Sequence, residues 1–132
     1  MSEVYVADTM ALILYLEKRR MPETIKHLFT GCVAGNCRIY VSSMSLAELG
    51  YLWEKGRIDV SLSEARSFFE KEQNFDVSEL DMEAISVAFK IDDIPELHDR
   101  LIAGTASKLA ATVITNDPDI TKSQWVKSIW SK

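Results

Sequence analysis

The sequence predicts an α/β protein with a mostly parallel central sheet flanked by helices on both faces. Short apolar segments rich in β-branched residues alternate with longer amphipathic segments, and several of the latter begin at helix-start signals. Strands separated by helices pair in parallel and become buried on both faces. The 132 residues suit one domain spanning 1–132, and 47% hydrophobic residues suffice for a core without disulfides.

The first predicted elements are a buried strand over residues 4–7 and a helix that starts directly after it. Asp8 and Thr9 are both residue types that cap helices, and the helix begins near Met10 and fades near Arg20. A cap placed directly after a buried strand puts the start of this helix at the carboxyl end of that strand.

A second helix and a second strand follow. Pro22 fits the first turn of a helix, residues 31–36 form a loop, and residues 38–42 contain the apolar strand. Ser45 and Glu48 match a capping box, which predicts the start of a third helix there. These elements continue the alternation of strands and helices.

Two further helices are predicted in the middle of the chain. Gly56 ends the third helix, and Ser61 repeats the capping signal for the next one. The segment 75–77 forms a short strand, after which Asp81 caps another helix. The loop at 92–95 ends in a proline, which disfavours helix in the residue before it.

The last third of the chain repeats the same pattern. A helix begins at Asp99, residues 112–115 form a strand, residues 116–119 form a turn, and residues 126–130 form a last strand. The chain shows no internal repeat and no linker, in agreement with a single domain.

The composition predicts a soluble, cytoplasmic protein. The apolar run at residues 11–16 is too short to cross a bilayer, and no signal peptide is recognisable. Cys32 and Cys37 are expected to be ordinary thiols, because the cytosol is reducing and the two histidines, His27 and His98, do not complete a zinc-binding pattern.

The formal net charge of −5 argues mildly against binding of nucleic acid. A metal ion held by clustered carboxylates would reverse the local sign and weaken that argument. Basic residues occur in small groups, and each group is equally compatible with a solvated surface. They are Lys18, Arg19, Arg20, Lys55, Arg57 and Arg100.

Four acidic residues fall where a sheet of this class gathers ligands. Asp8 and Asp117 come just after two predicted strands, and ligands bind at the carboxyl ends of parallel strands. Glu48 starts a helix that follows a strand, so it lies at the same edge. Asp99 follows a helix and a loop, and its spacing alone does not place it.

Carboxylates gathered at one edge repel one another unless they are protonated or a cation neutralises them. Oxygen ligands favour Mg²⁺ or Mn²⁺, which activate water and stabilise charge on a phosphate under attack. A local role remains open for each acid. Asp8 and Asp99 suit helix starts, Glu48 completes a capping box, and Asp117 precedes a proline in a turn.

Taken together, four short motifs resemble those of the PIN-domain family, including its VapC toxins. They are Val-Ala-Asp-Thr at Asp8, Ser-Leu-Ala-Glu-Leu at Glu48, His-Asp-Arg-Leu-Ile-Ala at Asp99, and Val-Ile-Thr-Asn-Asp at Asp117. The motifs occur in the family's order and span nearly the whole chain. The resemblance implies an Mg²⁺- or Mn²⁺-dependent endoribonuclease with RNA as substrate, a VapB-type antitoxin as partner, and a homodimer.

The resemblance also assigns roles to residues. It implies that Asp8, Glu48, Asp99 and Asp117 are both the metal ligands and the catalytic residues. The remaining positions are given supporting roles: Thr9 and Thr115 orient ligands or water, Asn116 assists, Asp119 adds an outer carboxylate, and Arg100 positions RNA. No dense stripe of basic residues marks a path for RNA. His98 suits a general base but also a structural role.

Two other functions remain open. A phosphoacceptor receiver domain also combines an α/β sheet, acidic residues and Mg²⁺, but Asp76 is poorly placed as the acceptor and no suitable lysine follows the last strands. A PIN-fold module that binds without catalysis is the second alternative. The aromatic residues of the middle helices suit the core or a groove for a dimer or antitoxin partner. They are Tyr51, Trp53, Phe68 and Phe69.

Overall fold

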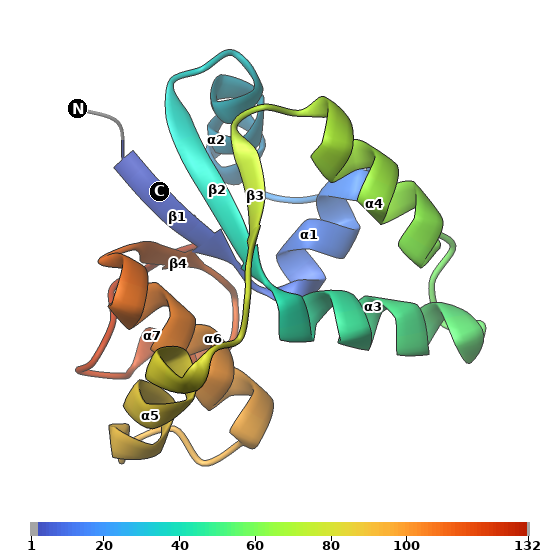
Figure 1. Cartoon of the computed structure of the whole chain (residues 1–132). Helices are drawn as coiled ribbons and strands as arrows, with labels where there is room; N and C mark the ends of the chain where they lie inside the picture. Colours follow the sequence, from blue (N-terminus) through green and yellow to red (C-terminus); the bar gives the residue numbers. More distant parts are fainter. Residues whose placement is uncertain (1–2, 132) are drawn as a thin grey trace.

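The computed structural model describes residues 3–131 and contains one five-stranded sheet (Figure 1). The strand order is β3-β2-β1-β4-β5, and every pair of neighbours is parallel. The strands are β1 (Glu3–Ala7), β2 (Cys37–Ser42), β3 (Phe75–Ser78), β4 (Thr112–Ile114) and β5 (Ser128–Ile129). The predicted α/β class with a parallel sheet is confirmed.

Helices cover both faces of the sheet. Val6 and Val113 face one core cluster, whereas their neighbours Ala7 and Ile114 face the other, because successive side chains of a strand point to opposite faces. Figure 1 shows α1, α3 and α4 on one side and α5, α6 and α7 on the other. The helices are α1 (Thr9–Leu16), α2 (Glu23–Val33), α3 (Ser43–Glu54), α4 (Leu62–Lys71), α5 (Met82–Lys90), α6 (Leu97–Leu109) and α7 (Pro118–Thr121).

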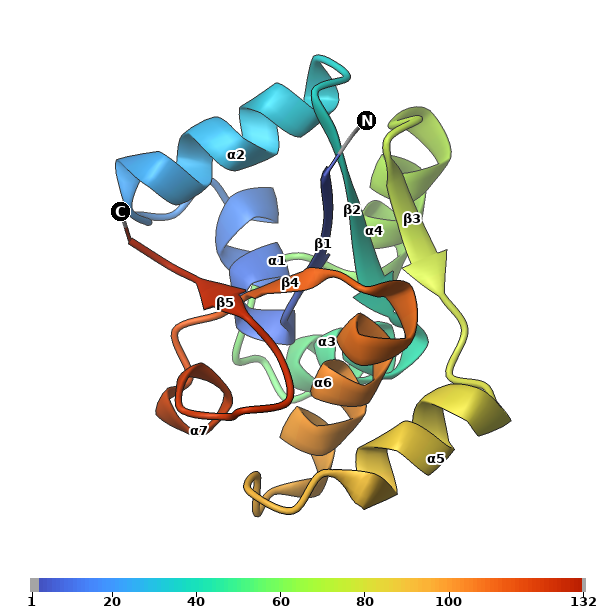
Figure 2. The same ribbon diagram turned by 90° about the vertical axis from the view of Figure 1, so that its left-hand side faces the viewer.

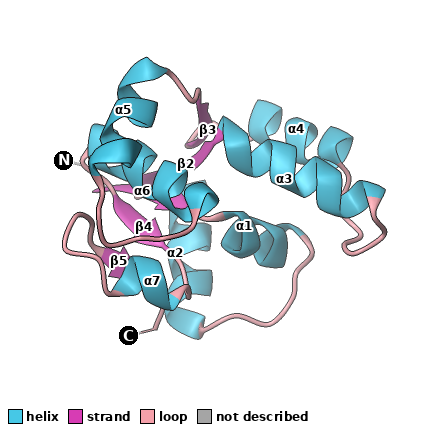
Figure 3. Ribbon diagram, turned by 90° about the horizontal axis from the view of Figure 1, so that it is seen from below, coloured by secondary structure: helices cyan, strands magenta, loops and turns pink. Residues whose placement is uncertain are grey.

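The carboxyl ends of the strands define the functional edge of the molecule. Figure 2 shows β1 and β2 running toward the side where α3 and α6 lie. Seen from below in Figure 3, helices α1, α3, α6 and α7 are grouped around this edge. Residues at the ends of β1 and β4 and near the starts of these helices are therefore brought together.

Two predicted helix starts are wrong. Helix α3 begins at Ser43, and Ser42 caps it by accepting a hydrogen bond of 3.1 Å from the backbone N–H of Met44. The predicted capping box of Ser45 and Glu48 therefore does not form. Helix α6 begins at Leu97 and is capped by Glu96, so that Asp99 is the third helical residue rather than the first. Three neighbouring serines offered alternative caps, and packing selected the earliest.

Other predicted boundaries changed less. The caps at Asp8 and Asp81 and the capping box at Ser61 are confirmed. Helix α2 extends to Val33, because its last turn still buries Cys32, and the predicted loop shrinks accordingly. The predicted turn at 116–119 contains the start of α7, and the last strand is limited to Ser128–Ile129.

The aromatic residues of the middle helices differ in how far they are buried. Phe68 and Phe69 pack against the core, as expected, whereas Tyr51 and Trp53 are 58% and 50% exposed. Cys32 and Cys37 are buried free thiols, and burial raises the pKa of Cys32 to about 12. Within residues 3–131, no helix has the length and apolarity needed to cross a bilayer.

Helices α5 and α6 approach each other closely at Gly104. A Cβ atom at this position would lie 2.6 Å from the carbonyl oxygen of Ala84 and 3.0 Å from the backbone nitrogen of Ala88. Such distances are far below van der Waals contact, so only glycine permits this approach. The contact fixes α6, and with it Asp99, against the rest of the domain.

Candidate metal centre

Asp8 is fixed at the end of β1 by two neighbours. Its Oδ1 accepts a hydrogen bond of 2.8 Å from the backbone N–H of Ala11, which caps α1, and its Oδ2 accepts one from the hydroxyl of Thr115. The residue is only 9% exposed. Asp8 therefore combines the predicted cap with a buried, oriented carboxylate at the functional edge.

Glu48 has no capping role, because it lies inside α3 rather than at its start. Its Oε1 accepts a hydrogen bond of 2.5 Å from the hydroxyl of Thr9, the first residue of α1. The interpretation of Glu48 as half of a capping box is thus wrong. The buried hydroxyl of Ser45 has no hydrogen-bond partner among the described residues.

Three aspartates come closest together. Asp99, Asp117 and Asp119 each place a carboxylate oxygen within 4.8 Å of the others. Asp117 caps α7, since its Oδ1 accepts from the backbone N–H groups of Asp119 at 2.8 Å and Ile120 at 3.3 Å. Asp119, expected only as an outer carboxylate, is a member of this tightest group.

Thr115 joins the two strand ends. Its hydroxyl donates to Asp8 and accepts a hydrogen bond of 3.0 Å from the backbone N–H of Asp117. Asp8 and Asp117 belong to segments more than a hundred residues apart, and this one buried hydroxyl connects both of them. Thr115 is therefore an orienting group, as the resemblance implied.

The carboxylates interact electrostatically. Burial raises the pKa of Asp99 to about 7, together with the nearby negative charges of Asp117, Glu96 and Asp8. Burial also raises the pKa of Asp8 against the opposing hydrogen bonds of Thr115 and Ala11, and the charges of Asp117 and Glu48 add to the increase.

Each of the four predicted acids is thus within electrostatic reach of at least one other. We call Asp8, Glu48, Asp99, Asp117 and Asp119 the carboxylate cluster. Its ligand atoms are all carboxylate oxygens. Asp8 is buried and the other four residues are partly buried, and a divalent cation would relieve their repulsion. The residues present therefore fit a hard divalent ion such as Mg²⁺ or Mn²⁺.

The comparisons with known proteins agree with this arrangement. The model of the PIN domain family matches residues 5–125. The chain belongs to the PIN domain family. No curated protein matches the sequence.

Solved structures share the PIN fold at low sequence identity. VapBC2 from Rickettsia felis, solved bound to a promoter DNA fragment, gives a TM-score of 0.73 at 18% identity, covering 96% of this chain and 98% of that one. DNA-bound VapBC from Salmonella typhimurium gives 0.71 at 22%, covering 98% of both. A toxin–antitoxin complex from Klebsiella pneumoniae gives 0.62 at 18%, covering 95% of both.

Two residues beside the PIN carboxylates differ from expectation. Glu96, which was not predicted, caps α6 by accepting a hydrogen bond of 3.0 Å from the backbone N–H of Asp99. His98 has a side chain that is 49% exposed, and its Nδ1 lies 3.1 Å from Glu96 and 3.8 Å from Glu48. His98 thus contacts acids at the surface instead of supporting the core. The sequence did contain a signal for this cap, because Glu96 is an acidic residue three positions before Asp99.

Arg100 does not face the cluster as expected. Its guanidinium lies 5.4 Å from the ring centroid of Phe89, and it donates a hydrogen bond of 3.4 Å to the carbonyl of Pro95. These contacts engage the side chain with α5 and the loop before α6. The structure therefore gives no support for Arg100 as an RNA-positioning group.

Proposed function

We propose that this PIN domain is a VapC-type toxin, an Mg²⁺- or Mn²⁺-dependent endoribonuclease that hydrolyses RNA phosphodiester bonds. The carboxylate cluster is the observation that carries the proposal. Asp8 and Asp117, the caps of α1 and α7, lie near acids of α3, α6 and α7. The close approach of Asp99 and Asp117 needs a cation once both are ionised.

The proposed catalytic and metal-binding residues are Asp8, Glu48, Asp99 and Asp117, with Asp119 as an additional ligand. A divalent ion bound there would lower the pKa of a water molecule and offset the charge of the phosphate. Thr115 holds the carboxylate of Asp8, and Thr9 holds that of Glu48. These hydroxyl groups keep the ligands oriented without adding positive charge of their own.

The proposal includes two protein partners. A VapB-type antitoxin is supported by the similar folds of VapBC and of a chain from a toxin–antitoxin complex. A homodimer is proposed from the resemblance to VapC toxins. The exposed side chains of Tyr51 and Trp53 on α3 are compatible with a covered surface of either kind.

The receiver-domain alternative is disfavoured by specific contacts. Asp76 lies within β3, at the edge of the sheet, and forms an ion pair with Arg38. A phosphoacceptor needs instead a free carboxylate at the end of a central strand. The non-catalytic module is disfavoured because each of the four motifs contains its acid, and each acid lies within electrostatic reach of another.

The decisive experiment measures cleavage of single-stranded RNA by the purified chain with Mg²⁺, with Mn²⁺ and with a chelator. We expect cleavage with a divalent ion and none with chelator. Asp8→Asn and Asp99→Asn should each abolish cleavage while leaving the circular dichroism spectrum unchanged. Glu83→Gln on α5, an exposed acid away from the cluster, is the control and should cleave as the parent does. Equal cleavage by Asp99→Asn and the parent would refute the proposal.

A further inference from the structure

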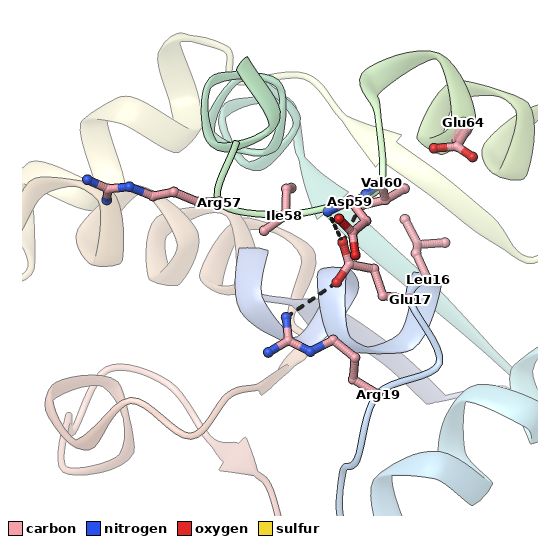
Figure 4. Close-up of a pocket in the computed structure, with 8 residues that line it drawn as sticks. All are labelled: Leu16, Glu17, Arg19, Arg57, Ile58, Asp59, Val60 and Glu64. Atoms are coloured by element: carbon pink, nitrogen blue, oxygen red, sulfur yellow. Dashed lines mark hydrogen bonds and ion pairs between the residues drawn. The ribbon is translucent and has the colours of Figure 1, made fainter. Parts of the chain in front are cut away.

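Two basic residues that are distant in the sequence, Arg19 and Arg57, line the same hollow of the surface. Arg19 lies just beyond the end of α1, and Arg57 lies between α3 and α4. Both line a hollow of about 680 Å³ formed where these segments meet (Figure 4). The sequence alone gave no sign that these groups come together.

Glu17 holds the two segments together. Its Oε2 accepts hydrogen bonds of 2.6 and 2.8 Å from the backbone N–H groups of Asp59 and Val60, and its Oε1 lies 3.3 Å from the guanidinium of Arg19. The Glu17 side chain is only 9% exposed. Its charge is therefore satisfied within the protein, and it orders the loop that carries Arg57.

A second hollow continues the positive charge. It measures about 190 Å³, and its lining contains Lys18, Arg19 and Lys26 but no acidic residue. Because Arg19 lines both hollows, Arg57, Arg19, Lys18 and Lys26 form what we call the basic strip.

The strip keeps free positive charge on its surface. Three acids, Glu17, Asp59 and Glu64, also line the first hollow; Glu17 is paired with Arg19, and Figure 4 shows Glu64 at the opposite end from Arg57. The second hollow is the part of the strip that has no acidic residue in its lining. Within residues 3–131, Lys18, Lys26 and Arg57 form no ion pair. These cations are therefore available to an external anion, although the chain as a whole carries a formal charge of −5.

We infer that the basic strip binds the phosphates of the single-stranded RNA substrate on one side of the carboxylate cluster. The inference rests on the proposed function. Asp8 caps the start of α1 and Arg19 follows its end, so a helix of eight residues, about 12 Å long, separates cluster and strip. At a stacked spacing of about 3.4 Å per nucleotide, this length corresponds to roughly four nucleotides.

The position of the strip favours a nucleic-acid backbone over an acidic protein segment. A strand that carries its scissile phosphate to the cluster must continue across a neighbouring surface, and the strip lies about 12 Å from Asp8, at the opposite end of α1. Regularly spaced phosphates match cations spread over two hollows, and their binding releases counterions. An acidic protein segment bound at the strip would not need to contact the carboxylate cluster as well.

The test compares two charge-matched double variants in an Asp99→Asn background, which permits binding without cleavage. Lys26→Gln/Arg57→Gln removes two cations of the strip, and Arg66→Gln/Lys71→Gln on α4 removes two elsewhere. The parent carries a formal net charge of −5, so the Asp99→Asn background carries −4, and each pair changes it to −6. Binding of a labelled single-stranded RNA, longer than the span between cluster and strip, is followed by fluorescence anisotropy in chelator at several salt concentrations.

We expect the strip variant to bind RNA about five- to tenfold more weakly, with a salt dependence reduced by about 1.4 in the slope of log K against log salt. The α4 variant should bind RNA nearly as the background does. Equal RNA affinities of the two double variants would overturn the inference. This is also the result expected if the strip binds an acidic protein segment instead of RNA.

A separate cleavage assay of the parent keeps the two proposals apart. If the parent cleaves RNA with Mn²⁺ while both double variants bind alike, the strip assignment fails and the nuclease proposal stands. If the parent binds RNA through the strip but never cleaves it, the nuclease proposal fails and the strip remains an RNA-binding surface.

Discussion

The two ends of helix α1 carry opposite charge and are built in different ways. At its start, Asp8 is buried, and hydrogen bonds from Ala11 and Thr115 fix its two oxygens. Beyond its end, Lys18 and Arg19 are exposed. A metal ion needs ligands at fixed positions, whereas a polyanion is attracted over a Debye length of about 8 Å. The comparison indicates that buried, oriented carboxylates suit metal coordination, whereas exposed cations suit the binding of a polyanion.

The largest expected effect is a loss of RNA cleavage at Asp117, where two substitutions distinguish the charge of the carboxylate from its role as a helix cap. Asp117→Asn retains an oxygen that caps α7 but removes the negative charge, so RNA cleavage should fall roughly 100- to 1000-fold, the size of one strong electrostatic contact. Its stability should remain close to that of the parent. Asp117→Ala loses the cap as well and should unfold with about 1 kcal/mol less free energy.

Asp81→Asn is the matched control for this pair. Asp81 caps α5 in the same manner, by accepting a hydrogen bond of 2.9 Å from the backbone N–H of Ala84, but it lies outside the cluster. Cleavage by Asp81→Asn should equal that of the parent. If Asp117→Asn also cleaved at the parental rate, Asp117 would be a helix cap only.

Metal binding at the carboxylate cluster should stabilise the protein, and substitutions in the basic strip should leave this stabilisation unchanged. At an Mn²⁺ concentration of about 100 times the dissociation constant, the free energy of unfolding should rise by about 2.7 kcal/mol. Thermal unfolding with Mn²⁺ and with chelator measures this difference. Lys26→Gln/Arg57→Gln should show the same gain as the parent, and Asp99→Asn should lose most of it. A gain that persists in Asp99→Asn would place the ion elsewhere.

A smaller effect is expected where Thr115 connects Asp8 and Asp117. Thr115→Val leaves a buried carboxylate oxygen without its donor and a backbone N–H without its acceptor, which should lower the free energy of unfolding by about 1–3 kcal/mol. Thr112→Val, at the start of β4 and without such contacts, should be nearly neutral in chemical denaturation. Similar losses for both substitutions would contradict the bridging role of Thr115.

A further expected effect is a dependence of stability on pH in the metal-free protein. Because the pKa of Asp99 is raised to about 7, the folded state binds its proton more tightly than the unfolded state, whose pKa is near the ordinary 3.8. Stability should therefore decrease as pH rises from about 4 to 7 and then level off.

Thermal unfolding in chelator at several pH values tests this direction. Asp8 adds to the slope in the same sense, since its pKa is also raised. Asp99→Asn should consequently flatten the profile without making it level. A parent that became more stable over this pH range, or a variant with an unchanged slope, would show that Asp99 is not the group responsible.

The sequence predicted the strand ends better than the helix starts. Asp8 and Asp117 follow short apolar runs whose strand character is local, and parallel topology then places both at one edge. The start of α3 was misplaced because Ser42 and Ser45 are both good caps, and the choice between them depends on tertiary packing. As a result, the sequence left open whether Glu48 had a merely local role.

Other features could not be predicted from sequence, because they depend on contacts between distant segments. Asp119 approaches Asp99 only when α7 packs beside α6. Glu96 was missed because the predicted helix began at Asp99, too late for Glu96 to be its cap. The basic strip exists because Glu17 fixes a loop more than forty residues away. No local pattern encodes that pairing.

The scatter of the cluster along the chain has a consequence for synthesis. Asp8 is among the first residues to be made, whereas Asp117 and Asp119 come more than a hundred residues later. Strand β4 must pair with β1 to bring them together. A growing chain that ends before Asp117 holds only part of the ligand set. A metal site arranged in this way cannot be complete while the chain is still being translated, and it forms only when the domain closes.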